Sequence, residues 1–175
     1  RAKGICLEVG AGTGNISQVL RAAGHTITVT DISPRMVEEM KKKGIEAVVC
    51  DAEHLLFPDA SFDTVVSSEM LYYLDKPDLF LKEAKRVLKP GGVLLLSSAN
   101  KRVARFYDWF RAVLRPFGVG GTYFDDPVHT FFSEKELCRL VEQASFISVE
   151  TKKILVVPIS SLHWLNKILE RTPLC

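Results

Sequence analysis

Three glycines follow the first apolar run of the sequence, residues 4–9, in the order Gly10-Ala11-Gly12-Thr13-Gly14. Side chains at such positions would block a tight turn and keep backbone N–H groups from approaching a ligand. The spacing is Gly-x-Gly-x-Gly, whereas the dinucleotide-binding fingerprint places its third glycine where this chain has Asn15. The turn therefore predicts a ligand-binding site and argues against NAD as the ligand.

Acidic residues follow three later apolar runs: Asp31, Asp51 and Glu69 each stand at the end of such a run. A carboxylate in this position can accept two hydrogen bonds from a diol such as a ribose. One acid at a strand end is equally typical of a helix cap or a turn. The placement of all three behind the glycine turn is what favours a binding site.

Apolar runs alternate with amphipathic stretches along most of the chain, which predicts strands that alternate with helices. This order builds βαβ units with right-handed crossovers, so the predicted fold class is α/β: a doubly wound, mostly parallel Rossmann-like sheet with helices on both faces. In such a sheet, ligands bind beyond the carboxyl ends of the strands. The six expected strands span residues 4–9, 26–30, 47–50, 62–67, 93–97 and about 147–157.

Residues 101–131 interrupt this alternation, and we interpret them as an insertion within one domain that spans residues 1–175. Aromatic and apolar residues recur at helical spacing within 101–115, and arginines and a lysine occupy much of the opposite surface. Three interpretations remain open for this stretch: a lid over the substrate, a surface that meets anionic membranes, or a helix that covers the sheet. A capping box at Ser133-Glu134-Lys135-Glu136 marks the next helix.

The composition excludes several classes of protein. Hydrophobic residues make up 47% and charged residues 25%, the balance of a soluble globular protein. Apolar stretches are too short to span a membrane and no leader pattern opens the chain, so we expect a cytoplasmic location. A net charge of +2 gives no field that favours nucleic acid. The four cysteines form no CxxC pair, so we expect reduced thiols and no metal site.

The segment from Leu7 to Asn15 resembles motif I of class I S-adenosylmethionine-dependent methyltransferases. Further stretches agree with their type 11 branch, the quinone-biosynthesis-like enzymes: Asp31, Asp51-Ala52-Glu53, the run from Leu56 to Asp63, and Leu88-Lys89-Pro90-Gly91-Gly92. The match covers residues 4–100 well and the remainder in outline. Leu56 departs from it, since the family often has proline there, and so does Met70-Leu71-Tyr72-Tyr73, where a His-rich run is common.

The resemblance implies that S-adenosylmethionine is the cofactor and S-adenosylhomocysteine the product. Asp31 would bind the ribose diol, Asp51 the adenine amino group, and Glu8 the methionine end, directly or through water. Ile32 and Met36 would contact the adenine ring. The complete set of expected cofactor-binding residues is Glu8, Gly10, Ala11, Gly12, Gly14, Asp31, Ile32, Met36, Asp51, Ala52, Glu53, Ser68 and Glu69.

The implied activity is methyl transfer by in-line displacement to a small, hydrophobic acceptor molecule, which is also the expected partner. His129, in the loop before the capping box, is the candidate general base, with His54 the weaker choice. Tyr72 and Tyr73 either line the acceptor pocket or pack in the core. The alternatives are a non-catalytic S-adenosylmethionine-binding module and a nucleotide-dependent oxidoreductase. The family fold has seven strands, so we also expect an N-terminal helix and a C-terminal strand to be absent from this chain.

Overall fold

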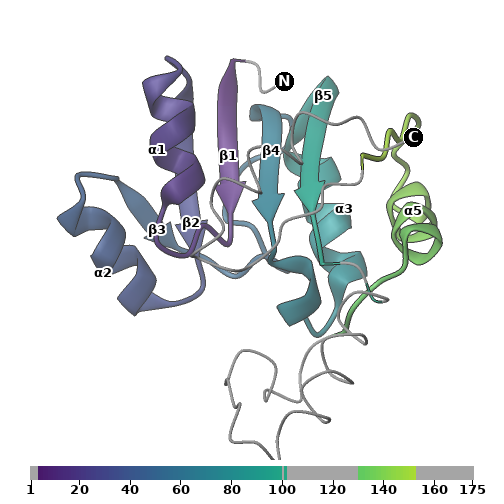
Figure 1. Ribbon diagram of the computed structural model, residues 1–175. Coiled ribbons are helices and arrows are strands. Elements are labelled where there is room, and N and C mark those ends of the chain that lie inside the picture. Colours follow the sequence, from purple (N-terminus) through teal and green to yellow (C-terminus); the bar gives the residue numbers. More distant parts are fainter. Residues whose placement is uncertain (1–3, 100, 102–129, 153–175) are drawn as a thin grey trace, which may run out of the picture.

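The computed structural model describes residues 4–99, 101 and 130–152, and these residues form one parallel sheet with helices packed against it (Figure 1). Five strands stand in the order β3-β2-β1-β4-β5, and every neighbouring pair is parallel. The chain adds β2 and β3 on one side of β1, and then returns to add β4 and β5 on the other side. This reversal of direction is the doubly wound arrangement. The strands are β1 (Ile5–Val9), β2 (Thr26–Asp31), β3 (Ala47–Val49), β4 (Phe62–Ser68) and β5 (Leu88–Ser97).

Four α-helices and one short 3-10 helix accompany these strands in the described part of the chain, and the last helix follows β5. They are α1 (Asn15–Ala22), α2 (Pro34–Lys42), η1 (Leu71–Tyr73), α3 (Pro77–Val87) and α5 (Glu134–Gln143). Ser33 caps α2 by accepting a hydrogen bond from the Met36 N–H, and the capping box predicted for α5 is present. The α/β fold class predicted from the sequence is confirmed.

The helices bury different faces of the sheet. Leu7 and Val9 of β1 lie in one apolar cluster with Phe80 and Leu81 of α3. This larger cluster also contains Val141 of α5, so α3 and α5 share that face. Glu8, which points to the opposite face because side chains alternate along a strand, meets Ser17 of α1. A second apolar cluster joins β2 and β3 to α2. The carboxyl ends of all five strands thus reach the same edge of a sheet that is covered on both sides.

Two expectations about the later strands need correction. Residues 147–152 form no strand, although a strand was predicted at about 147–157; residues 153–157 lie outside the described residues. Ile147 is 99% exposed, and β5 has no partner on its outer side in the described sheet, so the alternating pattern alone does not make a strand. The other correction concerns β5, which begins at Leu88 instead of Val93. Its register against β4 shifts between Phe62 and Thr64, which accommodates Lys89-Pro90-Gly91-Gly92 as a bulge.

Arg86 of α3 holds the segment that connects β3 to β4. Its guanidinium donates to the backbone oxygens of Leu55 and Phe57, at 2.9 and 2.8 Å, and to the Asp59 carboxylate at 2.7 Å. Glu83, one turn earlier on α3, accepts two further hydrogen bonds from it. Glu83 also accepts from the Leu55 N–H, and its pKa is lowered, first by the hydrogen bond from Arg86. One planar cation therefore fixes an irregular segment that follows the third strand end.

We predict that Arg86→Lys lowers the free energy of unfolding by about 1–3 kcal/mol, because an ammonium group cannot satisfy both backbone oxygens and both carboxylates together. Lys82→Ala is the matched control, since Lys82 makes only an exposed contact to Asp78 on the same helix. Urea denaturation followed by circular dichroism measures both variants. Equal stability of Arg86→Lys and wild type would show that this network does not hold the segment.

Candidate functional site

The glycine turn after β1 is closed by backbone hydrogen bonds to β2. The N–H groups of Gly10 and Ala11 both donate to the Thr30 oxygen, each at 3.0 Å. Gly10 has a φ of +70°, and a Cβ added there would lie 2.3 Å from the Met70 Cγ. Glycine is therefore required at this position by close packing against the segment that follows β4.

The absence of a side chain at Gly12 matters for a different reason. Its φ is +57°, and no atom of the described residues would lie within 4 Å of a Cβ added there. Its N–H donates to Asp31 Oδ2 at 2.7 Å, so the peptide itself is held firmly. The turn consequently presents an immobilised stretch of backbone to open space, which is the geometry that lets a ligand approach the main chain closely.

Asp31 joins the ends of the first two strands. It is the last residue of β2, is only 8% exposed, and accepts from the N–H groups of Gly12 and Ser33 at 2.7 and 2.9 Å. A carboxylate offers about four acceptor positions, so roughly two remain for a ligand. The neighbouring Ile32 is 67% exposed, an unusual environment for a large apolar side chain beside a buried acid.

Glu8 lies beneath the turn and is 2% exposed. Ser17, which is fully buried on α1, donates a hydrogen bond to Glu8 Oε2, and the Thr30 hydroxyl donates to the Glu8 backbone oxygen. Burial raises the pKa of Glu8 above its usual 4.5, and the hydrogen bonds from Ser17 partly oppose that shift. The role of Ser17 was not anticipated from the sequence, where Ile16, Val19 and Leu20 form the apolar stripe. Val19 proves to be 68% exposed.

The residues after β3 divide into two environments. The side chain of Asp51 is 47% exposed and accepts from the Glu53 N–H at 2.9 Å. Ala52 is buried at 7% exposure. Glu53 turns away to accept from the Lys76 N–H at 2.7 Å, which ties this segment to the start of α3. Asp51 therefore keeps acceptor positions for a ligand, whereas one oxygen of Glu53 is engaged in a structural contact.

Hydroxyl and carboxylate groups gather at the ends of β4 and β5. Ser97 donates to Glu69 Oε1 at 2.9 Å and accepts from the Glu69 N–H at 3.2 Å, and its hydroxyl lies 2.9 Å from that of Ser68. The Glu69 N–H also reaches the Ser97 backbone oxygen at 3.1 Å. Glu69 has a φ of +53°, in the left-handed region that residues other than glycine rarely adopt. Sequence reasoning included Ser68 and Glu69 but missed Ser97.

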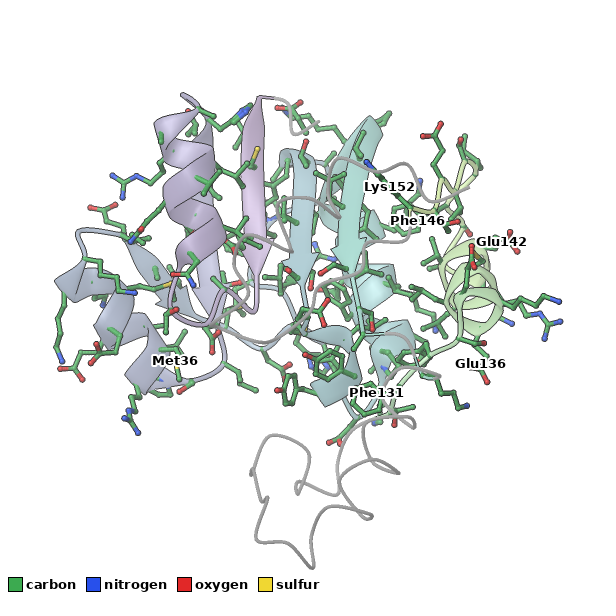
Figure 2. All side chains as sticks on the ribbon, in the orientation of Figure 1. Met36, Phe131, Glu136, Glu142, Phe146 and Lys152 are labelled. Carbon is green, nitrogen blue, oxygen red and sulfur yellow. The ribbon has the colours of Figure 1, made fainter. Side chains whose placement is uncertain are left out.

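Aromatic side chains lie beyond these strand ends. The two tyrosines of η1 have separate environments, with Tyr72 5% exposed and Tyr73 48% exposed, so each of the two expected roles suits one of them. The Phe131 ring packs against the Tyr72 ring with centroids 5.3 Å apart. The Thr130 N–H donates to the backbone oxygen of Tyr72. Figure 2 shows Phe131 and Met36 at the same edge of the sheet, Phe131 toward β5 and Met36 at the start of α2.

His129, the candidate general base, lies outside the described residues, and so do residues 102–115 of the expected basic helix. The side chain of His54 is 74% exposed, with its Nδ1 3.6 Å from Asp51 Oδ2. Cys6, Cys50 and Cys138 form no disulfide bond within the described residues, and burial raises the pKa of Cys6. Within 4–99, 101 and 130–152, no group of acids, histidines and cysteines is arranged to hold a metal ion, and no helix could cross a membrane.

These groups together suit an elongated ligand with a polar diol, an aromatic base and a charged end. The free positions of Asp31 match a diol, and the exposed face of Ile32 with the partly buried Met36 matches an aromatic ring. Asp51 can accept from an exocyclic amine at the edge of that ring. Glu8 and the open side of Gly12 lie toward the other end, under the turn. The donor set is thus that of a nucleoside site with an anionic contact for a positively charged tail.

Comparison with known proteins finds a matching family. Residues 7–96 match the methyltransferase domain family. A ubiquinone/menaquinone biosynthesis C-methyltransferase of Desulfotalea psychrophila is 30% identical, over 92% of this chain and 72% of that protein. A malonyl-[acyl-carrier protein] O-methyltransferase of Erwinia pyrifoliae is 40% identical over 99 residues, which are 54% of this chain and 37% of that enzyme.

Solved structures agree with the sequence comparison. A SAM-dependent methyltransferase of Thermotoga maritima superposes with a TM-score of 0.67 at 28% identity, over 85% of this chain and 65% of that one. A second, from Mesorhizobium loti, has a TM-score of 0.67 at 18% identity and covers 94% of this chain, which shows a shared fold. This chain spans only part of the length of each of these relatives.

We predict that Glu8→Gln raises the stability of the protein at neutral pH. Because the pKa of Glu8 is raised in the folded state, the native protein binds a proton more tightly than the unfolded chain does. The ionised carboxylate therefore costs stability, and this cost appears as pH rises above about 4.5, the usual value. Denaturation midpoints at pH 4 and pH 7.5 measure the effect. A Glu8→Gln variant that gains no stability relative to wild type between these two pH values would contradict it.

Proposed function

The chain belongs to the S-adenosylmethionine-dependent methyltransferases, and from that membership we propose that it binds S-adenosylmethionine beyond the ends of β1, β2 and β3 and transfers its methyl group to a small hydrophobic acceptor. S-adenosylmethionine is the cofactor of this family. The residues described above fit it, since they combine diol, adenine and ammonium partners along one edge of the sheet.

The observation that carries the proposal is the fixed glycine turn with Asp31 behind it. Asp31 holds the Gly12 peptide at 2.7 Å and keeps free acceptor positions at the point where the turn opens. Within the part of the chain that the structure describes, no atom lies within 4 Å of a Cβ added at Gly12. A ribose on Asp31 would therefore extend along the turn without displacing any side chain.

Each remaining residue has a role in this proposal that follows from its environment. Asp51 accepts from the adenine amino group, Ala52 lies beside the base through its backbone, and Ile32 and Met36 contact the ring. Glu8, held by Ser17, provides the negative charge beneath the methionine end. The turn residues Gly10, Ala11 and Gly14 shape the backbone around the tail, and Glu53 braces the adenine side through Lys76.

When bound, the cofactor supplies a methyl group on a positively charged sulfur. The protein has to hold the acceptor in line with that methyl group, and such positioning can contribute roughly 7–11 kcal/mol to lowering the barrier. Ser68 is the last residue of β4 and Glu69 follows it, on the side of the turn where an acceptor would approach, because Met70 packs directly on Gly10. The exposed face of Tyr73 and the half-buried Phe131 add apolar surface there.

We predict that Gly12→Ala weakens S-adenosylhomocysteine binding at least about tenfold, or about 1.4 kcal/mol, because the new methyl group enters the space that the ligand needs. Gly24→Ala is the matched control: Gly24 also has a positive φ, +83°, and no atom within 4 Å of an added Cβ, but it lies at the far end of α1. Both variants should lose similar stability, about 1–2 kcal/mol.

Isothermal titration calorimetry with S-adenosylhomocysteine measures affinity, and urea denaturation measures stability. Loss of affinity in Gly12→Ala alone supports the site. Equal affinities in wild type and both variants would place the ligand elsewhere, and no binding by the wild type would refute the proposed function.

We also predict that methyl transfer is confined to small apolar acceptors. Release of S-adenosylhomocysteine should be detectable with hydrophobic phenols, quinols or lipids, and not with RNA or protein as acceptor. Mass spectrometry of the acceptor after incubation with S-adenosylmethionine checks this. Transfer to RNA or protein alone would contradict the proposed acceptor class, and tight cofactor binding without transfer to any acceptor would favour a non-catalytic binding module.

A further inference from the structure

We propose that Glu69 is the proton acceptor for an aromatic hydroxyl substrate, and that Ser97 is the positioning residue that holds it. This inference rests on the proposed function and names the acceptor group of the same site.

The end of β4 lies beside the glycine turn. Val66 stands opposite Glu8 in the register of β1 and β4, so Ser68, two residues later, comes level with Gly10. Met70 then packs so closely on Gly10 that an added Cβ would lie 2.3 Å from its side chain. Glu69 lies between Ser68 and Met70 in the chain, and it is therefore next to the turn on which the cofactor tail would lie.

Ser97 holds Glu69 in one conformation through both backbone and side chain. The Glu69 N–H reaches the oxygen atoms of the Ser97 peptide and hydroxyl, at 3.1 and 3.2 Å, while the hydroxyl proton goes to Glu69 Oε1 at 2.9 Å. Since this hydroxyl has only one proton to give, the 2.9 Å contact with Ser68 must be donated by Ser68. The three residues form a directed chain that ends on one carboxylate oxygen.

The backbone of Glu69 shows that this arrangement has an energetic cost. A φ of +53° costs a residue with a side chain about 1–2 kcal/mol. Local strain of this kind persists only where neighbouring contacts impose it, and it is concentrated at functional sites. Here the contacts with Ser97 impose it, and the consequence is a carboxylate fixed at the strand end beside the turn.

The second carboxylate oxygen remains for the substrate. In the described part of the chain, Glu69 Oε2 accepts no hydrogen bond, and Glu69 as a whole is exposed. The aromatic residues of η1 follow directly, with Tyr73 48% exposed and Phe131 stacked on Tyr72. An acceptor that satisfies both surfaces has an aromatic ring for the aromatic side chains and a hydroxyl group for the carboxylate.

The proton balance of the reaction fits this assignment. The hydroxyl oxygen forms a bond to the methyl carbon as the bond from that carbon to sulfur breaks, and the bonding electron pair stays on sulfur. The hydroxyl proton passes to Glu69 Oε2, so a neutral ether, a neutral thioether and a neutral carboxylic acid result. The hydrogen bond from Ser97 to Oε1 keeps Oε2 directed at the substrate throughout.

The test uses α-naphthol as acceptor and compares Glu69→Gln, Ser97→Ala and Ser97→Thr with wild type. General base catalysis is typically worth about 10²–10⁴-fold, so Glu69→Gln should lose at least about 100-fold in kcat. Ser97→Ala should lose about tenfold, the effect of about 1.4 kcal/mol, and Ser97→Thr should recover most of it.

Two controls separate catalysis from binding and folding. Affinity for S-adenosylhomocysteine should stay within about twofold of wild type in all three variants, because the inference assigns Glu69 to the acceptor and no longer to the cofactor-binding residues among which the sequence placed it. Glu142→Gln, an exposed change on α5 (Figure 2), should leave every value unchanged.

Methoxynaphthalene, which keeps the ring but has no hydroxyl proton, should bind the S-adenosylhomocysteine complex more weakly than α-naphthol.

Several results would overturn the inference. A Glu69→Gln variant with wild-type kcat, or one whose S-adenosylhomocysteine affinity falls as far as its rate, would show that Glu69 is not the proton acceptor. A wild-type protein that binds S-adenosylmethionine but does not methylate α-naphthol would refute the aromatic hydroxyl as the acceptor group. Absence of S-adenosylmethionine binding would instead refute the proposed function itself.

Discussion

The hydrogen bond from the Gly12 N–H to Asp31 is the contact on which the site depends. It joins the turn after β1 to the last residue of β2, and the Thr30 oxygen adds two more bonds from the same turn. The backbone of the turn is thereby held in place by β2. A site built in this way does not have to order a loop when it binds, so less of the binding free energy is spent on ordering.

The order of the strands gives this contact its consequences. Because β1 stands at the centre, between β2 and β4, the ends of these strands lie on either side of the glycine turn. Asp31 approaches it from one side and Met70 from the other. The polar groups after β2 and β3 are then separated from those after β4 and β5 by the turn itself. Under the proposed function, the nucleoside half of the ligand lies on one side of the turn and the reacting half on the other.

Local features formed by contiguous residues could be predicted from the sequence, whereas contacts across the sheet could not. The glycine turn, Asp31 and the capping box at Ser133 are local patterns, and the structure contains each turn and cap where it was expected. Ser17 and Ser97 are single hydroxyls whose importance comes from Glu8 and Glu69 on other elements, and no spacing rule links them. The strand predicted at 147–157 failed within residues 147–152 for a related reason, since alternation can be present without a partner strand.

The energetically costly groups of the site share one design. A buried carboxylate at Glu8, a left-handed backbone at Glu69 and an open glycine turn would each be unfavourable alone. Each is held by a residue from a neighbouring element: Ser17 of α1, Ser97 of β5 and Asp31 of β2. These partners are themselves fixed by helix and sheet packing, so the stability of the core maintains the geometry of the site. It follows that changes to Ser17 or Ser97 should act on the proposed site through the positions of Glu8 and Glu69, whereas a change to Asp31 would also remove a group proposed to meet the ligand.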